Sequence, residues 1–236
     1  MKKKLYTAIG LMSGTSMDGI DLSIISSDGH HEFSNILDDY YEYDKNLQDQ
    51  LVRLRDLVLT KKDLLQNSEK LRELERNLTL FHGDAVNQSL KKYRDPIDLI
   101  GFHGHTISHN PDEQHTLQIG NGRLLASATG VDVVNDLRSS DVKAGGQGAP
   151  LAPIYHKALM KSQDLPAIIL NIGGVANITW VDTLDENLIG FDTGPGNALI
   201  DDWIKRKTGH HYDNDGFLAS KGQVHKGILT ELLASH

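Results

Sequence analysis

Two stretches of this chain share one design, in which an apolar strand runs into a glycine turn and a second strand follows. They are LYTAIGLMSGTSMDGIDLSIIS, residues 5–26, and LPAIILNIGGVANITWV, residues 165–181. Glycines and small polar residues between β-rich runs are typical of tight turns. The repetition indicates that each turn opens a separate part of the fold.

Strands and helices alternate along the rest of the chain. Residues 44–59 and 67–93 have apolar residues at helical spacing, and β-rich runs surround them. This alternation predicts an α/β fold. We expect a first domain over residues 1–165 and the start of a second over residues 166–236, because Gln163, Asp164 and Pro166 interrupt the pattern there.

Composition narrows the possible partners and surroundings. The net charge of −8 disfavours nucleic acid or an anionic membrane as the main partner. The chain has no cysteine, which excludes disulfides and thiolate metal sites and fits a cytoplasmic protein. The apolar run Leu5–Met12 is short and interrupted, so a first strand is favoured over a secretory signal, and no segment is apolar enough to span a bilayer.

The residues of the first turn suit a phosphate group. Backbone N–H groups in a tight glycine turn form an anion nest, and Ser13, Thr15 and Ser16 add hydroxyl donors. A bare Asp18 would repel phosphate, but a magnesium ion that binds both removes the conflict. Two such turns facing each other could hold a polyphosphate. The alternative is a plain β-hairpin with turn residues.

Common nucleotide and nucleophile motifs do not fit this turn. No lysine follows at the spacing of a Walker loop, and the next run reads as a strand, whereas a dinucleotide fingerprint needs a helix there. Residues 14–18 miss the GxSxG nucleophile elbow at the last position.

GLMSGTSMDGID, residues 10–21, resembles the N-terminal signature of the anhydro-N-acetylmuramic acid kinases. Later stretches agree with that family in order and cover essentially the whole chain, namely GFHGHT (101–106), residues 115–153, NIGGVANIT (171–179) and GFDTGPGNALIDDW (190–203). Members of the family are longer. We therefore expect the second lobe to be incomplete and the residues of the adenosine pocket to lie beyond residue 236.

The resemblance implies the two-lobed, ribonuclease H-like architecture shared by actin, Hsp70 and sugar kinases. It also implies ATP and Mg²⁺ as cofactors, and a cytoplasmic homodimer that binds an amino sugar. The 6-oxygen of 1,6-anhydro-N-acetylmuramic acid is locked in an internal bridge, so water must add at the anomeric carbon while the 6-oxygen takes the γ-phosphoryl group. The implied nucleotide-binding residues are Ser13, Gly14, Thr15, Ser16, Met17, Asp18, Gly19, Gly173, Gly174 and Asn177, with Asp18 holding Mg²⁺ through water.

A carboxylate must accept the proton of that water, and Asp192 in FDTGPGN is the candidate general base. It follows the apolar run Leu188–Phe191, so we expect it at the end of a strand. The matching family aspartate has this role. The alternative is that Asp192 only caps the following turn or helix.

The sugar site is expected to use an arginine and two histidines. Arg138 has donors for an oxygen-rich or carboxylate-bearing ligand, although it could instead form an ion pair with Asp136 or Asp141. His103 and His105 sit in a glycine loop after a strand and could be structural. The candidate substrate-binding residues are His103, His105, Arg138, Gln147, Gly194, Gly196 and Asn197.

Three other functions stay open. Another sugar kinase of the same fold would use Asp192 to deprotonate a free hydroxyl. A metal-dependent hydrolase would use the histidines, but HExxH is absent and His103-x-His105 lacks acidic residues at ligand spacing. The chain could also be a truncated form that binds ligand without turnover.

Overall fold

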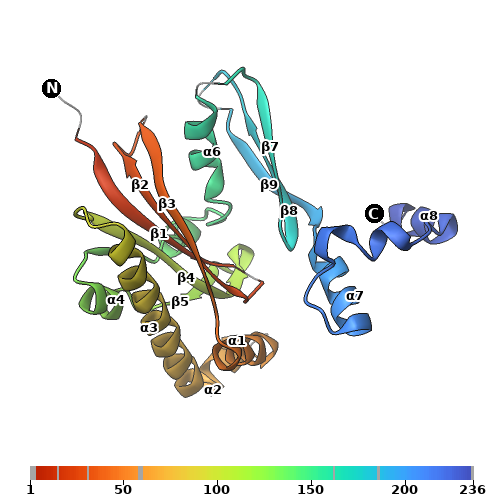
Figure 1. The fold of residues 1–236 in the computed structure, drawn as a ribbon, viewed down its shortest axis with the longest axis horizontal. Helices are drawn as coiled ribbons and strands as arrows, with labels where there is room; N and C mark the ends of the chain where they lie inside the picture. The colour runs from red at the N-terminus through yellow and green to blue at the C-terminus, as the bar shows by residue number, and fades with distance from the viewer. Residues whose placement is uncertain are drawn as a thin grey trace. The chain divides into compact units, whose positions relative to one another are not determined.

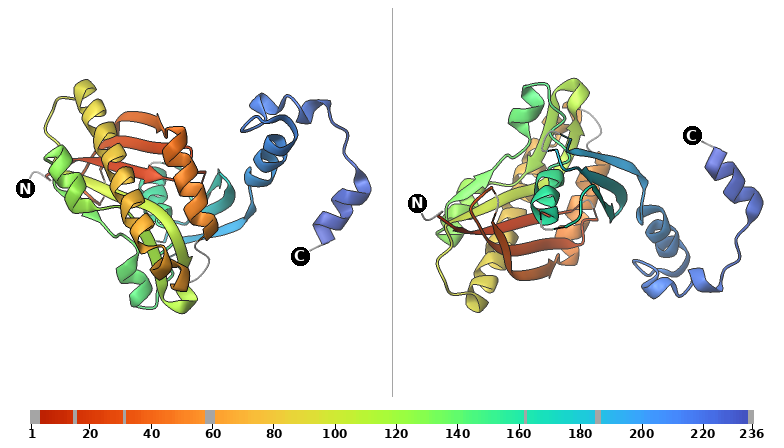
Figure 2. Two further views of the ribbon diagram at one scale, coloured as in Figure 1. Left: turned by 90° about the horizontal axis from the view of Figure 1, so that it is seen from below. Right: turned by 90° about the horizontal axis from the view of Figure 1, so that it is seen from above.

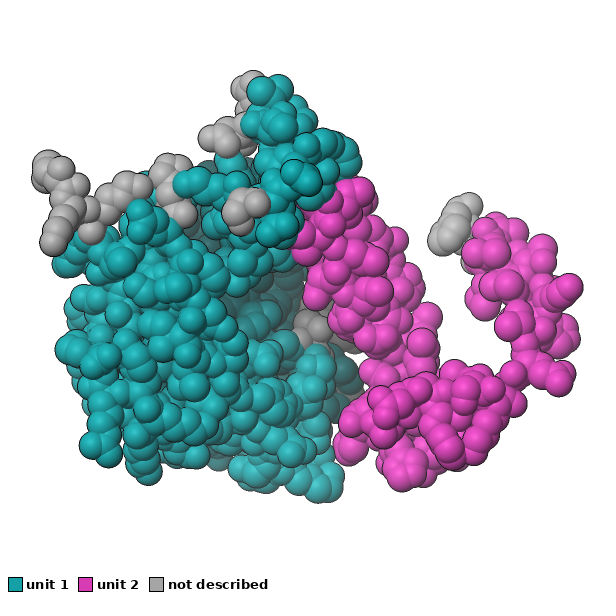
Figure 3. All heavy atoms as spheres, turned by 45° about the horizontal axis from the view of Figure 1, so that its top comes forward, with its two compact units in different colours: residues 1–167, 180–189 teal, residues 168–179, 190–236 magenta. Residues whose placement is uncertain are grey.

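The computed structural model describes residues 4–14, 16–30, 32–57, 61–161, 163–184 and 187–234. The chain divides into two compact units, which Figure 3 shows in teal and magenta. The first unit comprises Met1–Ala167 and Trp180–Ile189, and the second comprises Ile168–Thr179 and Gly190–His236. Both contain helices and strands, so the α/β class predicted from the sequence is confirmed.

The first unit contains a mixed six-stranded sheet (Figure 1). β3, β2 and β1 are antiparallel neighbours, and β4 runs parallel to β1 on the other side. β4 pairs with β6 through its first half and with β5 through its second half. The strands are β1 (Tyr6–Ser13), β2 (Gly19–Ser27), β3 (Phe33–Glu42), β4 (Leu99–Asn110), β5 (His115–Ile119) and β6 (Val133–Asn135).

Helices α1, α3 and α4 lie on one face of this sheet (Figure 2, left). Segment 138–150 was expected to be a loop, but it contains the short helix α5, which forms because Val142 turns inward and is buried. The helices of the first unit are α1 (Lys45–Leu57), α2 (Lys61–Gln66), α3 (Ser68–Lys92), α4 (Gly122–Thr129), α5 (Ser139–Lys143) and α6 (Ala152–Met160), with a 3₁₀ turn at Pro111–Glu113.

The core of the first unit follows from simple periodicities. Alternate residues of β2 point toward the helices, and Ile20, Leu22 and Ile24 are fully buried. On α3, Leu74 and Leu78 are buried at helical spacing, as the sequence predicts. The hydrophobic contact between sheet and helices therefore holds the strand ends that carry the candidate site.

An extra residue in β4 changes which of its side chains face the helices. Leu11 of β1 pairs with Phe102, but Ser13 pairs with His105, so β4 bulges between the two pairs. Gly104 adopts φ +71° there, and a Cβ on it would lie 2.3 Å from the Ile119 carbonyl oxygen. The expectation that the two histidines follow a strand in a loop is wrong, because β4 continues through the bulge to Asn110.

The second unit is built on a three-stranded sheet in the order β7, β8, β9. Its helix α7 covers the predicted range 198–208, and α8 follows near the C-terminus. No described helix is both long and apolar enough to cross a membrane. The elements are β7 (Ala167–Ile172), β8 (Val175–Val181), β9 (Ile189–Pro195), α7 (Ala198–Thr208) and α8 (Lys226–Ala234), with 3₁₀ turns at Asn214–Gly216 and Ala219–Lys221.

Candidate functional site

The first glycine turn joins β1 to β2. The Met17 N–H donates to the Gly14 carbonyl at 3.2 Å, which closes the turn. The Ser16 hydroxyl donates to Asp18 Oδ1 at 2.6 Å, and both of these side chains are exposed. Thr15 lies outside the described residues. Ser16 and Asp18 are thus the polar groups that this turn presents to a ligand.

Other predicted residues of the turn have mainly structural surroundings. The Met17 side chain is 3% exposed and packs in the core beside Ile20, with φ at 56°. Gly19 is buried at the start of β2. The Tyr43 N–H donates to the Asp18 carbonyl at 2.8 Å and fixes the second half of the turn. A nucleotide would therefore meet the backbone of Met17 and Gly19 rather than a side chain.

Acidic groups crowd the end of β2. Burial raises the pKa of Asp21, and the nearby Asp18 carboxylate raises it further. Burial and the charge of Asp18 raise the pKa of Tyr40 to about 12. These shifts place Asp18, Asp21 and Tyr40 in one electrostatic neighbourhood, where a bound cation would offset the repulsion between the carboxylates.

Ser13 lies at the end of β1 and points inward. It continues the alternation of Ile9 and Leu11, and it is only 2% exposed. Its Oγ lies 2.8 Å from His105 Nδ1 and accepts a hydrogen bond from the Tyr43 hydroxyl at 2.7 Å. The Ser13 hydroxyl is thus engaged inside the protein.

His103 and Arg138 form a second polar group. The Arg138 Nε–H donates to His103 Nε2 at 2.9 Å, and His103 Nδ1 lies 2.9 Å from the Gly104 carbonyl oxygen. Since arginine only donates and a carbonyl only accepts, the His103 ring is neutral with its proton on Nδ1. Burial lowers the pKa of His103, and the charge of Arg138 lowers it further, against the opposing hydrogen bond to Gly104.

The loop after α5 wraps around the Arg138 side chain. Arg138 Nη1 donates to the Gly148 carbonyl at 2.6 Å, and the Gly148 N–H donates to Asp141 Oδ2 at 2.7 Å. Burial lowers the pKa of Arg138. Its hydrogen-bond partners are thus His103 and Gly148, not the carboxylate of Asp136 or Asp141. Gln147 is exposed on this loop.

A polar cavity of about 260 Å³ lies beside this group in the first unit. Asp136, with φ at 56°, forms part of its wall. Gln118, Asn135 and Asp136 were not singled out from the sequence, although the family-like stretches contain them. The lining residues are Phe102, His103, Thr116, Leu117, Gln118, Gly120, Asn135, Asp136 and Ser139.

The second glycine turn, between β7 and β8, packs against the segment that leads into α7. The Asn197 N–H donates to the Gly173 carbonyl at 2.7 Å, and the Gly196 N–H donates to the Gly174 carbonyl at 3.0 Å. A Cβ on Gly196 would lie 2.2 Å from the Gly173 carbonyl oxygen, so only glycine fits there. The structure thus brings together four predicted residues, which are Gly173, Gly174, Gly196 and Asn197.

Asp192 lies within β9 rather than at the end of a strand, because β9 continues to Pro195. Its side chain is exposed. The neighbouring Thr193 hydroxyl donates to the Ala176 carbonyl at 3.1 Å, and Gly194 adopts φ 141°. Asn177 is half-buried on β8. Asp192 is not the N-cap of α7, which is Asn197, so the helix-cap alternative is not supported.

The described residues contain no cluster of three or more histidine, aspartate or glutamate side chains placed to hold a metal ion. This does not favour the metal-dependent hydrolase. It fits a magnesium ion that keeps several waters and takes few protein ligands. The exposed Asp18 carboxylate is the chain's best-placed donor for such an ion.

A model of the family described as anhydro-N-acetylmuramic acid kinase matches residues 6–236. The chain belongs to the anhydro-N-acetylmuramic acid kinase family. Proteins of that name from Pelagibacter ubique, Rhizorhabdus wittichii and Zymomonas mobilis are 46%, 47% and 45% identical to it over 98%, 96% and 96% of this chain. The chain spans 62%, 62% and 64% of the length of these three relatives.

A solved structure of an exopolyphosphatase-like protein matches 86% of this chain and 54% of its own, at 12% identity and a TM-score of 0.41. At that score the likeness does not establish a shared fold. Membership of the anhydro-N-acetylmuramic acid kinase family rests on the sequence match alone.

Proposed function

We propose that the protein carrying this chain is an ATP-dependent kinase that opens 1,6-anhydro-N-acetylmuramic acid with water and phosphorylates it to N-acetylmuramic acid 6-phosphate. The observation that supports this most is the family match over residues 6–236. We further propose that it acts in the recycling of cell-wall peptidoglycan, in the cytoplasm and as a homodimer.

The nucleotide is proposed to bind the glycine turns. Backbone N–H groups of the first turn and the Ser16 hydroxyl would face the phosphates, and Asp18 would hold Mg²⁺ through water. The ion would neutralise charge on the phosphates. The second turn, with Gly173, Gly174 and Asn177, would bind them from the other lobe.

The amino sugar is proposed to bind near Arg138. The guanidinium uses one N–H on His103 and one on Gly148, so its remaining N–H groups can bind a carboxylate or sugar oxygen. The cavity beside it is lined by His103 and other polar side chains, which suits an oxygen-rich ligand. Gln147, Gly194, Gly196 and Asn197 complete the proposed set.

Asp192 is proposed to accept a proton from the water that attacks the anomeric carbon. An exposed carboxylate next to a glycine turn can approach a bound sugar without steric hindrance. The bond between the anomeric carbon and the bridging oxygen breaks, and that oxygen takes the γ-phosphoryl group. Catalysis then depends on positioning and charge neutralisation, as in other phosphoryl transfers.

The test is to incubate the chain with ATP, magnesium and the anhydro sugar in ¹⁸O-labelled water. Mass spectrometry is expected to find the 6-phosphate with ¹⁸O at the anomeric carbon, above the exchange seen when unlabelled product stands in the same water. A 6-phosphate without excess label would favour a kinase that acts on a free hydroxyl. Binding of ATP and sugar without product would support the form that lacks turnover.

A further inference from the structure

Three side chains from different parts of the first unit meet at the start of the first glycine turn. Ser13 ends β1, His105 follows the β4 bulge, and Tyr43 follows β3. Their exposed fractions are 2%, 1% and 5%. The Tyr43 hydroxyl lies 2.7 Å from Ser13 Oγ, which lies 2.8 Å from His105 Nδ1.

The hydrogen positions follow from the donor inventory. Burial raises the pKa of Tyr43, so its hydroxyl stays protonated and donates to Ser13. Ser13 has a single hydroxyl hydrogen, which is then available for His105 Nδ1. His105 must therefore carry its ring proton on Nε2. Burial lowers the pKa of His105 to about 4, which keeps the ring neutral.

His82 of α3 has the complementary arrangement. It is fully buried, and its Nδ1 lies 2.8 Å from the Leu78 carbonyl oxygen, which can only accept. The His82 proton is therefore on Nδ1, and Nε2 is an acceptor. Among the described residues, neither His82 Nε2 nor His105 Nε2 has a hydrogen-bond partner. One is an acceptor, the other is a donor, and each ring influences the pKa of the other electrostatically.

We propose that Tyr43, Ser13, His105 and His82 form one buried hydrogen-bond relay that fixes the start of the first glycine turn. The relay runs from the Tyr43 hydroxyl to the Leu78 carbonyl. Tyr43 also anchors the far side of the turn, because its N–H donates to the Asp18 carbonyl. Tyr43 and His105 thus act as positioning residues, and His105 acts through Ser13 instead of on the sugar.

The relay has a consequence for ligand binding, which rests on the proposed function. A nest of backbone N–H groups binds phosphate only when the N–H groups already converge, because ordering the turn on binding costs free energy. Removing the Tyr43 hydroxyl frees Ser13 to rotate and loosens both ends of the turn. The exposed Ser16 and Asp18 side chains are left in place.

The first test reads the ring protons of the ¹⁵N-labelled 236-residue chain by long-range ¹H–¹⁵N correlation spectra. His105 is expected to be protonated on Nε2, and His82 on Nδ1. A proton on His105 Nδ1 would overturn the relay, since Ser13 could not then donate to it. This result does not depend on any ligand.

The second test compares Tyr43→Phe with Tyr41→Phe, a matched loss of a hydroxyl that bonds Ser89 in the same unit. Tyr43→Phe is expected to raise amide exchange at Gly14 and residues 16–19, and to weaken Mg-ATP binding, each by about three- to tenfold. Tyr41→Phe is expected to leave both at wild-type values. Equal effects of the two variants, or unchanged exchange in Tyr43→Phe, would overturn the proposal.

If the wild-type chain does not bind Mg-ATP, the proposed function fails. The ring protonation and the amide exchange then still decide whether the relay exists, so the two failures can be told apart.

Discussion

The Oγ atom of Ser13 lies 2.8 Å from Nδ1 of His105, although 92 residues separate the two in the chain. Parallel pairing of β1 with β4 brings them together, and the bulge in β4 turns the His105 ring toward Ser13. Side chains as well as backbone thus tie the first glycine turn to the neighbouring strand. The conformation of this turn depends on how β4 is built.

The bulge should therefore be sensitive to substitution. Gly104→Ala places a Cβ 2.3 Å from the Ile119 carbonyl oxygen at φ +71°. Gly130→Ala is the control, because Gly130 has φ +72° but no atom near its Cβ position. Urea unfolding is expected to show a loss of about 1 kcal/mol for Gly130→Ala and at least about 3 kcal/mol for Gly104→Ala. Equal losses would show that the close contact has no importance.

Arg138 should be irreplaceable by lysine. Arg138→Lys removes the Nε–H that donates to His103 and leaves that buried ring nitrogen without its donor. Urea unfolding is expected to show a loss of about 1 to 3 kcal/mol, and sugar binding should weaken as well. Arg123→Lys, on the exposed surface of α4, is the control and should match the wild type. Wild-type sugar affinity in Arg138→Lys would remove Arg138 from the proposed site.

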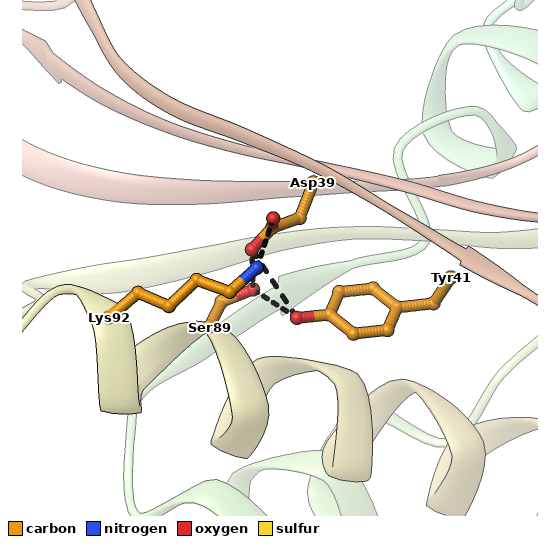
Figure 4. Close-up of polar contacts among 4 residues, drawn as sticks. All are labelled: Asp39, Tyr41, Ser89 and Lys92. Carbon is orange, nitrogen blue, oxygen red and sulfur yellow. Dashed lines mark hydrogen bonds and ion pairs between the residues drawn. The ribbon is translucent and has the colours of Figure 1, made fainter.

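The Asp39 carboxylate should make stability depend on acid. It accepts hydrogen bonds from Lys92 and from the buried Ser89, as Figure 4 shows. Burial raises the pKa of Asp39, but the bonds from Lys92 and Ser89 outweigh burial, so the net shift is downward. A lowered pKa contributes stability above the unfolded value of about 3.9, and this contribution is lost as the pH falls through the folded value.

Asp39→Asn should accordingly lose about 1 kcal/mol at pH 7 and approach the wild type at low pH. Urea unfolding between pH 7 and the acid transition measures this convergence. Asp84→Asn, on the exposed side of α3, is the control and should run parallel to the wild type. A difference between Asp39→Asn and wild type that stays constant with pH would contradict the assigned role.

Asp192→Asn should abolish turnover and leave sugar binding largely intact. Loss of a general base lowers the rate by about a hundredfold or more, whereas the amide keeps nearly the same shape. Turnover is measured as release of sugar phosphate, and binding by calorimetry. Asp202→Asn on α7 is the control, because Asp202 is also an exposed carboxylate of the second unit. Near-normal turnover in Asp192→Asn would remove the assignment.

Local patterns predicted much of the fold. The helix at 198–208 has the expected bounds, and the long helix α3 differs from its expected range by one residue at each end. These elements are long or clearly periodic, so local signals determine them. The short helix α5 was missed because a single buried residue, Val142, stabilises it, and one residue shows no period.

The candidate site was harder to predict, because its contacts are long-range. Sequence motifs identified His103 and Arg138 but not their hydrogen bond, which joins residues 35 positions apart. Tyr43 was missed entirely, since a tyrosine after a strand carries no local signal of a bond to Ser13. The alternation of Ile9, Leu11 and Ser13 did contain a signal, because it places the serine on the buried face of β1.

A crystal structure of the protein with the anhydro sugar, magnesium and a non-hydrolysable ATP analogue would test the account most directly. The expected result is that the β- and γ-phosphates lie against the backbone of residues 14–19 and 173–174, and that the Asp192 carboxylate lies within about 3 Å of a water beside the anomeric carbon. Phosphates bound away from these turns, or an Asp192 side chain directed away from the sugar, would contradict it.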